Sequence, residues 1–279
     1  MLRRFRYQLA KSRLRIPLVW YRHRGLTPYD VFVASYPRSG STWLRFLLFE
    51  TLTRNEAGFD NVNRMLPDVG MHAGATALLA NQGRLIKTHE AFRPEYRRAI
   101  YVVRDARDVV LSEYAYQKAL GRGNGSFDGY LTEFLHGTAT GYGSWLDHVG
   151  GWIDSPLAAR GDLLVIRYRD LRNDTQSAME EILQFLGVGV DCQTILNAIR
   201  NNEFQKMRVK EDRNPQLGKS GDESRRFVRK GAVGGWHDQL TAGQLARIEE
   251  KAGKMLVRLG FDSERSGFSR GANVAASAD

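Results

Sequence analysis

The segment SYPRSGSTW, residues 35–43, combines glycine, hydroxyl and basic side chains in a pattern suited to holding phosphate. It lies between a predicted strand and a predicted helix, which is where an open α/β sheet binds its ligands. Gly40 lets the backbone approach an anion, and its N–H group and those of Ser41 and Thr42 would point at that anion from the helix N-terminus. With the Arg38 cation beside them, these groups predict a binding site for a phosphate-bearing ligand.

This loop differs from the Walker A sequence, GxxxxGK[ST], in which the lysine reaches the β- and γ-phosphates and the hydroxyl holds magnesium. Here the basic residue precedes the glycine by two positions instead of following it directly. Cys192 is the only cysteine, so the sequence has no CxxC pair or Cys/His cluster for zinc. The expected ligand is a nucleotide that is bound without an obligatory metal.

The elements that position this loop alternate between short β-branched runs and segments of helical periodicity. Strands are predicted at residues 30–35, 84–89, 98–103 and 163–167, and helices at residues 42–51, from Asp105 or Asp108 through Ala115, and at residues 175–186. Alternation of strand and helix predicts a parallel sheet that is covered on both sides. The expected fold is therefore α/β, a P-loop-like three-layer fold with a central parallel sheet flanked by helices.

Composition divides the chain into an arm, a main domain and a tail. Residues 1–28 are predicted to form a basic N-terminal arm, residues 29–262 the domain, and residues 263–279 a disordered tail. Within the domain, two polar stretches without periodicity are predicted to be loops. One lies at residues 121–129, and the other, at about residues 210–226, is expected to be a mobile, lid-like loop.

Positive charge is concentrated at the N-terminus. The formal net charge is +10, and residues 1–25 hold eight arginines and lysines and no acid, so only +2 remains on the rest of the chain. A folded nucleic-acid-binding domain would carry its cations on the body, so no nucleic-acid partner is expected. The arm is either a solvated extension, the commoner fate of charge runs, or a helix on an anionic membrane surface. In the second case Leu2, Phe5, Leu9 and Ile16, which stand among the arginines, would form the apolar part of that helix.

Localisation is predicted from what the sequence lacks. No apolar run approaches the roughly 20 residues that span a bilayer. The apolar run at residues 16–21 is too short for a secretory signal, and a single cysteine allows no internal disulfide. We expect a cytoplasmic protein, with membrane association through residues 1–25 and homodimerisation left open.

The phosphate loop resembles that of a known family. YPRSGSTW, residues 36–43, is similar to the loop that binds the 5′-phosphosulfate in sulfotransferases that use 3′-phosphoadenosine-5′-phosphosulfate (PAPS), although their commonest loop has lysine in place of Arg38. The resemblance implies donor contacts from Arg38, Ser39, Gly40, Ser41, Thr42 and Trp43. Further segments extend the similarity over residues 30–260, most of the chain.

YVVRDARDVVLS, residues 101–112, resembles the strand and helix that bind the 3′-phosphate in this family. The resemblance implies that Arg104 and Ser112 hold this phosphate. Arg104 ends a predicted strand and Ser112 lies about two turns into the helix, so both can face one side of a nucleotide. The structural alternative is a surface arginine and a serine inside a helix.

FVRKGAVGGW, residues 227–236, is similar to the RKGxxGxW segment near the C-terminus of the family. Two adjacent cations and a permissive glycine suit a clamp over a phosphate, formed by Arg229, Lys230 and Gly231. The alternative is a solvated turn. If the clamp is correct, the mobile stretch before it would become ordered when the nucleotide binds.

LVIRYRDL, residues 164–171, resembles the strand-to-loop segment that supplies an aromatic residue to the adenine in the family. The resemblance implies that Tyr168 contacts the base, with Trp43 stacked on its other side. Either ring could instead belong to the core, because a tryptophan in the first turn of a helix more often packs than binds a ligand.

GRLIKTHEAF, residues 83–92, contains a Lys87-Thr88-His89 triplet that resembles the KTH segment of the family's catalytic histidine. An imidazole that titrates near neutral pH can take the proton of an acceptor hydroxyl. The resemblance implies that His89 is the general base and that Lys87 and Arg38 stabilise charge on the leaving adenosine 3′,5′-bisphosphate. The remaining histidines are assigned no role: His23, His72, His136, His148 and His237.

The resemblance implies an enzyme that transfers the sulfuryl group of PAPS, without a metal, to a hydroxyl or amine of a small-molecule, lipid or carbohydrate acceptor. One alternative is a P-loop nucleotide-dependent kinase, which the missing GK[ST] ending disfavours. The other is a non-catalytic nucleotide- or membrane-binding module, against which the intact motifs count.

The acceptor side matches no pattern. Glu90 stands where better-known family members carry an apolar residue, so it could favour a polar or cationic acceptor or be an exposed acid. A further set of apolar residues could line an acceptor pocket or belong to the core: Phe59, Met65, Tyr130, Phe134, Tyr142 and Trp145.

Overall fold

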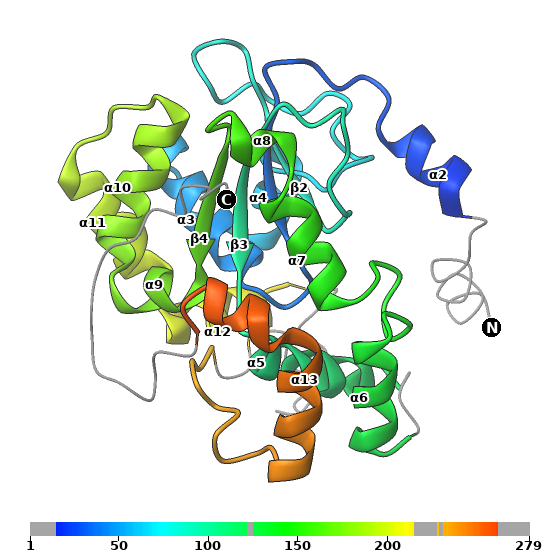
Figure 1. Ribbon diagram of the computed structural model, residues 1–279. Helices are drawn as coiled ribbons and strands as arrows, with labels where there is room; N and C mark the ends of the chain where they lie inside the picture. The colour runs from blue at the N-terminus through cyan, green and yellow to red at the C-terminus, as the bar shows by residue number, and fades with distance from the viewer. Residues whose placement is uncertain (1–14, 122–124, 215–227, 229–230, 262–279) are drawn as a thin grey trace.

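A computed structural model describes residues 15–121, 125–214, 228 and 231–261 (Figure 1). Half of the predicted arm, residues 1–14, most of the predicted lid and the whole of the predicted tail lie outside the described residues. Arg229 and Lys230 of the predicted phosphate clamp lie outside them too.

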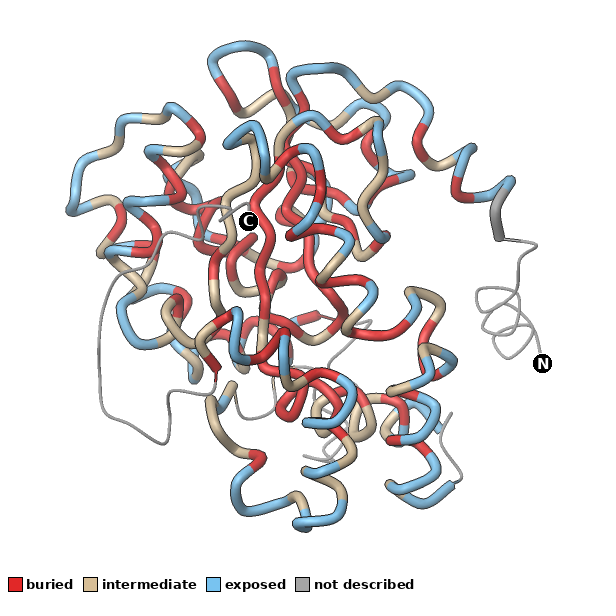
Figure 2. Tube along the Cα trace, viewed as in Figure 1, coloured by how far each residue is buried: buried red, intermediate tan, exposed pale blue. Residues whose placement is uncertain are grey.

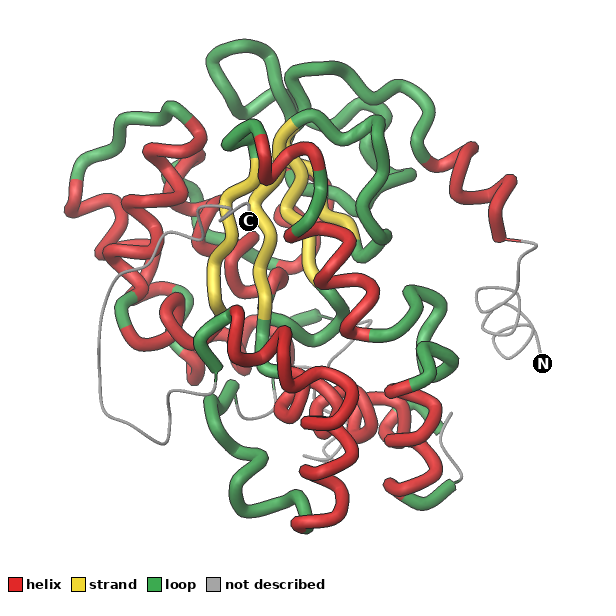
Figure 3. The backbone as a smooth tube through the Cα atoms, viewed as in Figure 1, coloured by secondary structure: helices red, strands yellow, loops and turns green. Residues whose placement is uncertain are grey.

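Four parallel strands form the centre of the molecule (Figure 3). They are β1 (Val31–Ser35), β2 (Leu85–Thr88), β3 (Arg98–Val103) and β4 (Leu163–Arg167), in the spatial order β2-β1-β3-β4. Every residue of β1 is buried, as expected of a parallel strand with helices on both faces of its sheet. The predicted strands are thus confirmed.

Twelve helices are described around this sheet. They are α2 (Arg15–Arg22), α3 (Ser41–Thr53), α4 (Phe59–Met65), α5 (Ala106–Ala119), α6 (Phe127–Leu135), α7 (Trp145–Ile153), α8 (Pro156–Ala159), α9 (Tyr168–Asn173), α10 (Thr175–Leu186), α11 (Cys192–Asn201), α12 (Phe204–Asp212) and α13 (Ala242–Arg258). Within the described residues, none of these helices is long and apolar enough to cross a membrane.

Alternate side chains of the strands contribute to two hydrophobic cores. Buried residues follow the strands at the centre of the molecule (Figure 2). Phe32 and Ala34 of β1 belong to the core shared with α5, α6, α7 and α13. Val31 and Val33 point to the other face, where α3, α4, α10 and α11 pack. Because successive side chains of a strand point to opposite faces, this arrangement requires a helical layer on each side. It confirms the expected α/β three-layer fold.

Four helices differ from the predictions. Helix α5 begins at Ala106 because the Asp105 side chain accepts the N–H of Arg107, and it continues to Ala119 instead of ending at Ala115. Helix α6 begins inside the predicted loop at residues 121–129, since Ser126 caps it. Helix α12 includes the first residues of the predicted lid, and Tyr168 starts helix α9 where a loop was expected.

Buried charges anchor helix α12 to the rest of the molecule. The Lys210 ammonium group donates to Glu50 Oε1 at 2.9 Å and to Asn202 Oδ1 at 2.8 Å. Glu50 Oε1 also accepts the backbone N–H of Ala57 at 2.9 Å. The side chains of Glu50, Asn202 and Lys210 are all buried. The ion pair between Glu50 and Lys210 therefore replaces the hydration that each charge loses on folding.

The substitution Lys210→Met should lower the free energy of unfolding by about 3 to 5 kcal/mol, because it leaves the Glu50 carboxylate buried without its cation. Urea denaturation followed by circular dichroism measures this change. The double variant Glu50→Gln/Lys210→Met removes both charges and should regain much of the loss. Equal destabilisation of the single and double variants would contradict the role given to the ion pair.

Candidate active site

A cavity of about 590 Å³ opens at the carboxyl ends of the strands. Most of the site residues predicted from the sequence line it: Arg38, Gly40, Ser41, Thr42, Trp43, Lys87, His89, Arg104, Ser112, Tyr168 and Gly231. Ser39 is buried and is not among the lining residues. The structure therefore brings together segments that are far apart in the sequence.

The loop between β1 and α3 has the backbone shape of an anion site. Gly40 has φ of 99°, and a Cβ atom at this position would lie 2.3 Å from the Tyr168 ring, so only glycine fits. Helix α3 has no side-chain N-cap, which leaves the N–H groups of its first turn to be satisfied by a ligand or by water. Arg38, with φ of 65°, holds a left-handed conformation that a side chain adopts at some strain.

The predicted phosphate-binding cations converge on this loop. Arg38 Nε lies 3.3 Å from Ser112 Oγ, and its guanidinium carbon lies 4.7 Å from the centre of the Tyr116 ring. Arg104 donates to the carbonyl of Arg38 at 3.1 Å and to that of Ala232 at 2.7 Å. Arg104 Nε is buried without a hydrogen-bond partner in the described part of the protein. An anion in the cavity could accept this bond, so the residues present fit a phosphate.

Two aromatic rings line the same cavity. The Tyr168 hydroxyl donates to the carbonyl of Gly231 at 3.2 Å, and the Arg104 guanidinium lies 4.9 Å from the Tyr168 ring. Trp43 Nε1 donates to the carbonyl of Asn202 at 2.8 Å. Asn202 is the residue that Lys210 binds, so the buried charges of α12 also fix the Trp43 ring.

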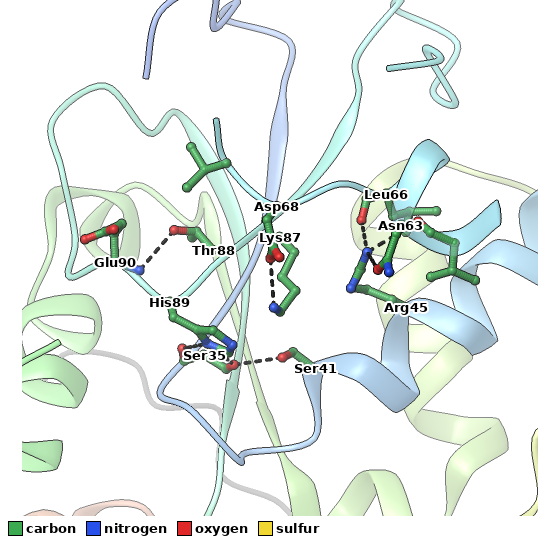
Figure 4. Close-up of polar contacts among 12 residues, drawn as sticks. Ser35, Ser41, Arg45, Asn63, Leu66, Asp68, Lys87, Thr88, His89 and Glu90 are labelled. Carbon is green, nitrogen blue, oxygen red and sulfur yellow. Dashed lines mark hydrogen bonds and ion pairs between the residues drawn. The ribbon is translucent and has the colours of Figure 1, made fainter. Parts of the chain in front are cut away.

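His89 is held as a neutral imidazole at the end of β2 (Figure 4). Its Nδ1 lies 2.8 Å from the carbonyl oxygen of Ser35, and because a carbonyl can only accept, Nδ1 carries the proton and Nε2 the lone pair. Burial and the Lys87 cation lower the pKa of His89 to about 3. Among the described residues Nε2 has no hydrogen-bond partner, and a proton acceptor is thus available in the cavity.

His148, to which the sequence analysis assigned no role, binds the backbone of His89. His148 Nε2 donates to the carbonyl of His89 at 3.0 Å, and the Tyr101 hydroxyl donates to His148 Nδ1 at 2.8 Å. Burial lowers the pKa of His148 to about 4, which keeps it neutral for this arrangement. No local signal separates His148 from other histidines, because its partner lies 59 residues away in the sequence.

Lys87 is engaged by a carboxylate that sequence reasoning missed. Its ammonium group donates to Asp68 Oδ1 at 2.7 Å (Figure 4). Although burial raises the pKa of Asp68, the Lys87 and Arg45 cations lower it to about 2. The buried Arg45 guanidinium binds the carbonyls of Val62 and Leu66 and so fixes the segment that carries Asp68. Asp68 is the only protein anion that the structure records on the Lys87 ammonium group.

A second group of lining residues lies around His89 and Glu90. Glu90 is buried, so the alternative of an exposed acid is wrong, and Arg22 Nη1 lies 3.4 Å from its Oε1. The Tyr142 ring lies 5.7 Å from the His89 ring and lines the cavity. The other aromatic candidates for an acceptor pocket, Phe59, Tyr130, Phe134 and Trp145, are buried in the cores, and Met65 packs against one of them. Further lining residues that the sequence did not indicate are Leu18, Val19, Val69, Thr140, Phe204 and Met207.

Comparison with known proteins gives consistent matches. The family model described as "Sulfotransferase domain" matches residues 28–260. Human sulfotransferase 2A1 is 30% identical over 231 residues, which cover 77% of this chain and 80% of the relative. Rat sulfotransferase 1 family member D1 is 28% identical over 244 residues, covering 80% and 82%.

Two solved structures share the fold. Mouse sulfotransferase SULT7A1 complexed with PAP has a TM-score of 0.65 at 23% identity, covering 87% of this chain and 90% of that one. Retinol dehydratase in a complex with retinol and PAP has a TM-score of 0.68 at 20% identity, covering 88% and 86%. Since the family model spans most of the chain and the human relative is 30% identical over most of its own length, this chain belongs to the sulfotransferase family.

Proposed function

We propose that this protein transfers the sulfuryl group of PAPS to a hydroxyl or amine of a small-molecule acceptor, with His89 as general base. The observation that carries this proposal is the single cavity in which the phosphate loop, Arg104 and the lone pair of His89 meet. The complexes of SULT7A1 and retinol dehydratase with PAP support the donor, and retinol in the second complex supports a small-molecule acceptor.

The donor is held by its two phosphate groups. The N-terminus of α3 and the hydroxyls of Ser41 and Thr42 take the 5′-phosphosulfate, as anions bind at helix N-termini. Arg104 and Ser112 take the 3′-phosphate; Arg229 and Lys230, which lie outside the described residues, are predicted from the sequence alone to bind it as well. The adenine lies between the rings that line the cavity, Trp43 and Tyr168.

Transfer is an in-line displacement at sulfur. His89 Nε2 accepts the proton of the acceptor as its oxygen or nitrogen attacks, and the bond from sulfur to the phosphate oxygen of the donor breaks. Arg38 and Lys87 stabilise the negative charge that grows on this oxygen. To do so, Lys87 exchanges its Asp68 contact for the donor, a change that keeps its charge paired throughout.

Two other functions have less support. A kinase would require the lysine that follows glycine in Walker A loops, which this loop lacks. A non-catalytic nucleotide-binding module has no need for a neutral histidine held with Nε2 free in the same cavity. Three further expectations stay predictions: lipid or carbohydrate acceptors, homodimerisation, and membrane contact through residues 1–25.

The donor can be tested by calorimetry with PAP, the adenosine 3′,5′-bisphosphate product, and separately with ATP and magnesium. We expect PAP to bind and ATP with magnesium to bind far more weakly, because only PAP offers a 3′-phosphate to Arg104. Transfer of ³⁵S from labelled PAPS to a panel of phenols, sterols and amines then identifies acceptors. Tight binding of ATP with magnesium and none of PAP would contradict the proposal.

The substitution His89→Asn should reduce kcat by about 10²- to 10⁴-fold and leave the affinity for PAP unchanged. Asparagine keeps a donor toward Ser35 but has no base at the position of Nε2. ³⁵S transfer and PAP calorimetry separate the two effects. The exposed His136 provides the matched control, since His136→Asn should alter neither quantity. Unchanged turnover in His89→Asn would remove this residue from the mechanism.

The pH dependence of kcat/KM should show no fall near pH 6.5 on the acid side. Because the pKa of His89 is lowered to about 3, the imidazole of the free enzyme is already neutral at pH 5 and gains nothing as the pH rises to 7. Rate measurements with a non-titrating acceptor between pH 5 and 8 test this expectation. A decline with an apparent pKa near 6.5 that is absent from the residual activity of His89→Asn would oppose it.

The substitution Arg104→Ala should weaken PAP binding by about tenfold or more, as expected for the loss of a charge-assisted hydrogen bond. The affinity for adenosine 5′-monophosphate, which lacks the 3′-phosphate, should change much less. Calorimetry with both ligands measures the ratio, and the surface arginine variant Arg160→Ala serves as control. An equal loss for the two nucleotides would show that Arg104 does not recognise the 3′-phosphate.

A further inference from the structure

Helix α2 precedes the family-matched residues 28–260, yet it packs beside the active-site cavity. Arg22 Nε and Nη2 donate to the carbonyl of Val69 at 3.0 and 2.6 Å, and His23 Nε2 lies 2.7 Å from the Tyr96 hydroxyl. Gly70 abuts Arg22 so closely that a Cβ atom there would lie 2.8 Å from it. The C-terminal end of α2 is therefore fixed to the body.

This helix has one face toward the cavity and another toward solvent. Val19 is buried, and Leu18, Val19 and Arg22 line the cavity. The exposed fractions of the nearby large apolar residues are 50% for Leu18, 61% for Trp20, 65% for Tyr21 and 75% for Met71. Leu18 is both exposed and cavity-lining, so it places this apolar part of α2 beside the opening of the cavity. We call the four residues the apolar rim.

Positive charge accompanies the apolar rim. The guanidinium carbon of Arg24 lies 5.3 Å from the Tyr21 ring, and that of Arg93 lies 5.2 Å from the Trp20 ring. The sequence ahead of the helix adds only basic charges: Arg3, Arg4, Arg6, Lys11 and Arg13. Tryptophan and tyrosine are the side chains that favour the membrane–water interface, and each nearby cation adds attraction to anionic lipid.

We propose that the apolar rim, with the Arg24 and Arg93 cations beside it, docks this protein on an anionic membrane surface, with the cavity opening toward the bilayer. An amphiphilic acceptor that lies in the interface then reaches His89 past Leu18 and Val19 without crossing bulk water. The choice of acceptor rests on the proposed function, whereas the docking itself does not. Charge complementarity selects an anionic surface over a neutral one.

Co-sedimentation of the full chain with lipid vesicles tests the docking. We expect binding to phosphatidylcholine vesicles that contain a third of phosphatidylglycerol, little binding to pure phosphatidylcholine, and loss of binding at high salt. The double variant Trp20→Ser/Tyr21→Ser should bind about tenfold more weakly, as removal of interfacial aromatic area predicts. Val257→Ser, at an equally exposed apolar position on α13, is the matched control and should bind like the wild type.

Orientation can be tested through the single exposed cysteine. Cys192 begins α11, on the side of the molecule away from α2 in Figure 1. An environment-sensitive dye on Cys192 should not respond to anionic vesicles. When the same dye labels position 71 in the variant Cys192→Ser/Met71→Cys, anionic vesicles should shift its fluorescence emission to the blue, as expected for a dye that enters a membrane. A shift at both positions, or a blue-shifted dye at position 71 before vesicles are added, would overturn the proposal.

The docking proposal would also be overturned by equal binding to neutral and anionic vesicles, or by unchanged vesicle binding of Trp20→Ser/Tyr21→Ser. Calorimetry with PAP on each variant keeps this result separate from the proposed function. Variants that bind PAP like the wild type but no longer bind vesicles support docking by the apolar rim. If the wild-type protein binds vesicles but not PAP, the docking proposal stands and the proposed sulfotransferase mechanism is contradicted.

Discussion

The hydrogen bond from His89 Nδ1 to the carbonyl of Ser35 joins the proposed base to the proposed phosphate loop. Ser35 is the last residue of β1, and its hydroxyl donates to Ser41 at the start of α3. The parallel register pairs Ala34 with Thr88, so the residues that follow meet at the same edge of the sheet. The end of β1 therefore sets both the tautomer of His89 and the start of helix α3. Because β1 and β2 are neighbours in the sheet, their register fixes the distance between His89 and the N-terminus of α3.

Two lysines near the cavity are paired in different surroundings. Lys87 lines the cavity and is held by Asp68, whose side chain is about half exposed, and burial of the ammonium group lowers the pKa of Lys87. Lys210 is held by Glu50 and Asn202 in the core and shapes the site indirectly, through Asn202 and Trp43 and through the anchored helix α12. Lys87 thus contributes positive charge to the cavity, whereas Lys210 contributes only to the position of neighbouring side chains and of helix α12. The difference lies in whether the cation reaches the cavity.

The half of the cavity around His89 and Glu90 is built largely by connections and by helix α2. Helix α2 precedes the family match, Asp68 lies on a segment fixed by Arg45, and Tyr142 lies in the connection before α7. These segments lie around His89 together with Glu90, whose charge Arg22 partly balances. The other half, with the phosphate loop and Arg104, is built by strand ends and the helices that follow them, so the sheet positions it.

The sequence by itself determined the strands, the sheet type and the donor loop, because their signals are local: a buried β-branched run, a glycine before a helix, and a histidine that ends a strand. Helix α5 was predicted to end at Ala115, four residues short of its end at Ala119, and helix α6, which Ser126 caps, was not predicted at all. Only the tertiary structure decided that Asp68 engages Lys87, that His148 supports His89, and that α2 borders the cavity. Those contacts join residues many positions apart, and no periodicity or spacing records a contact that exists only after the layers have packed.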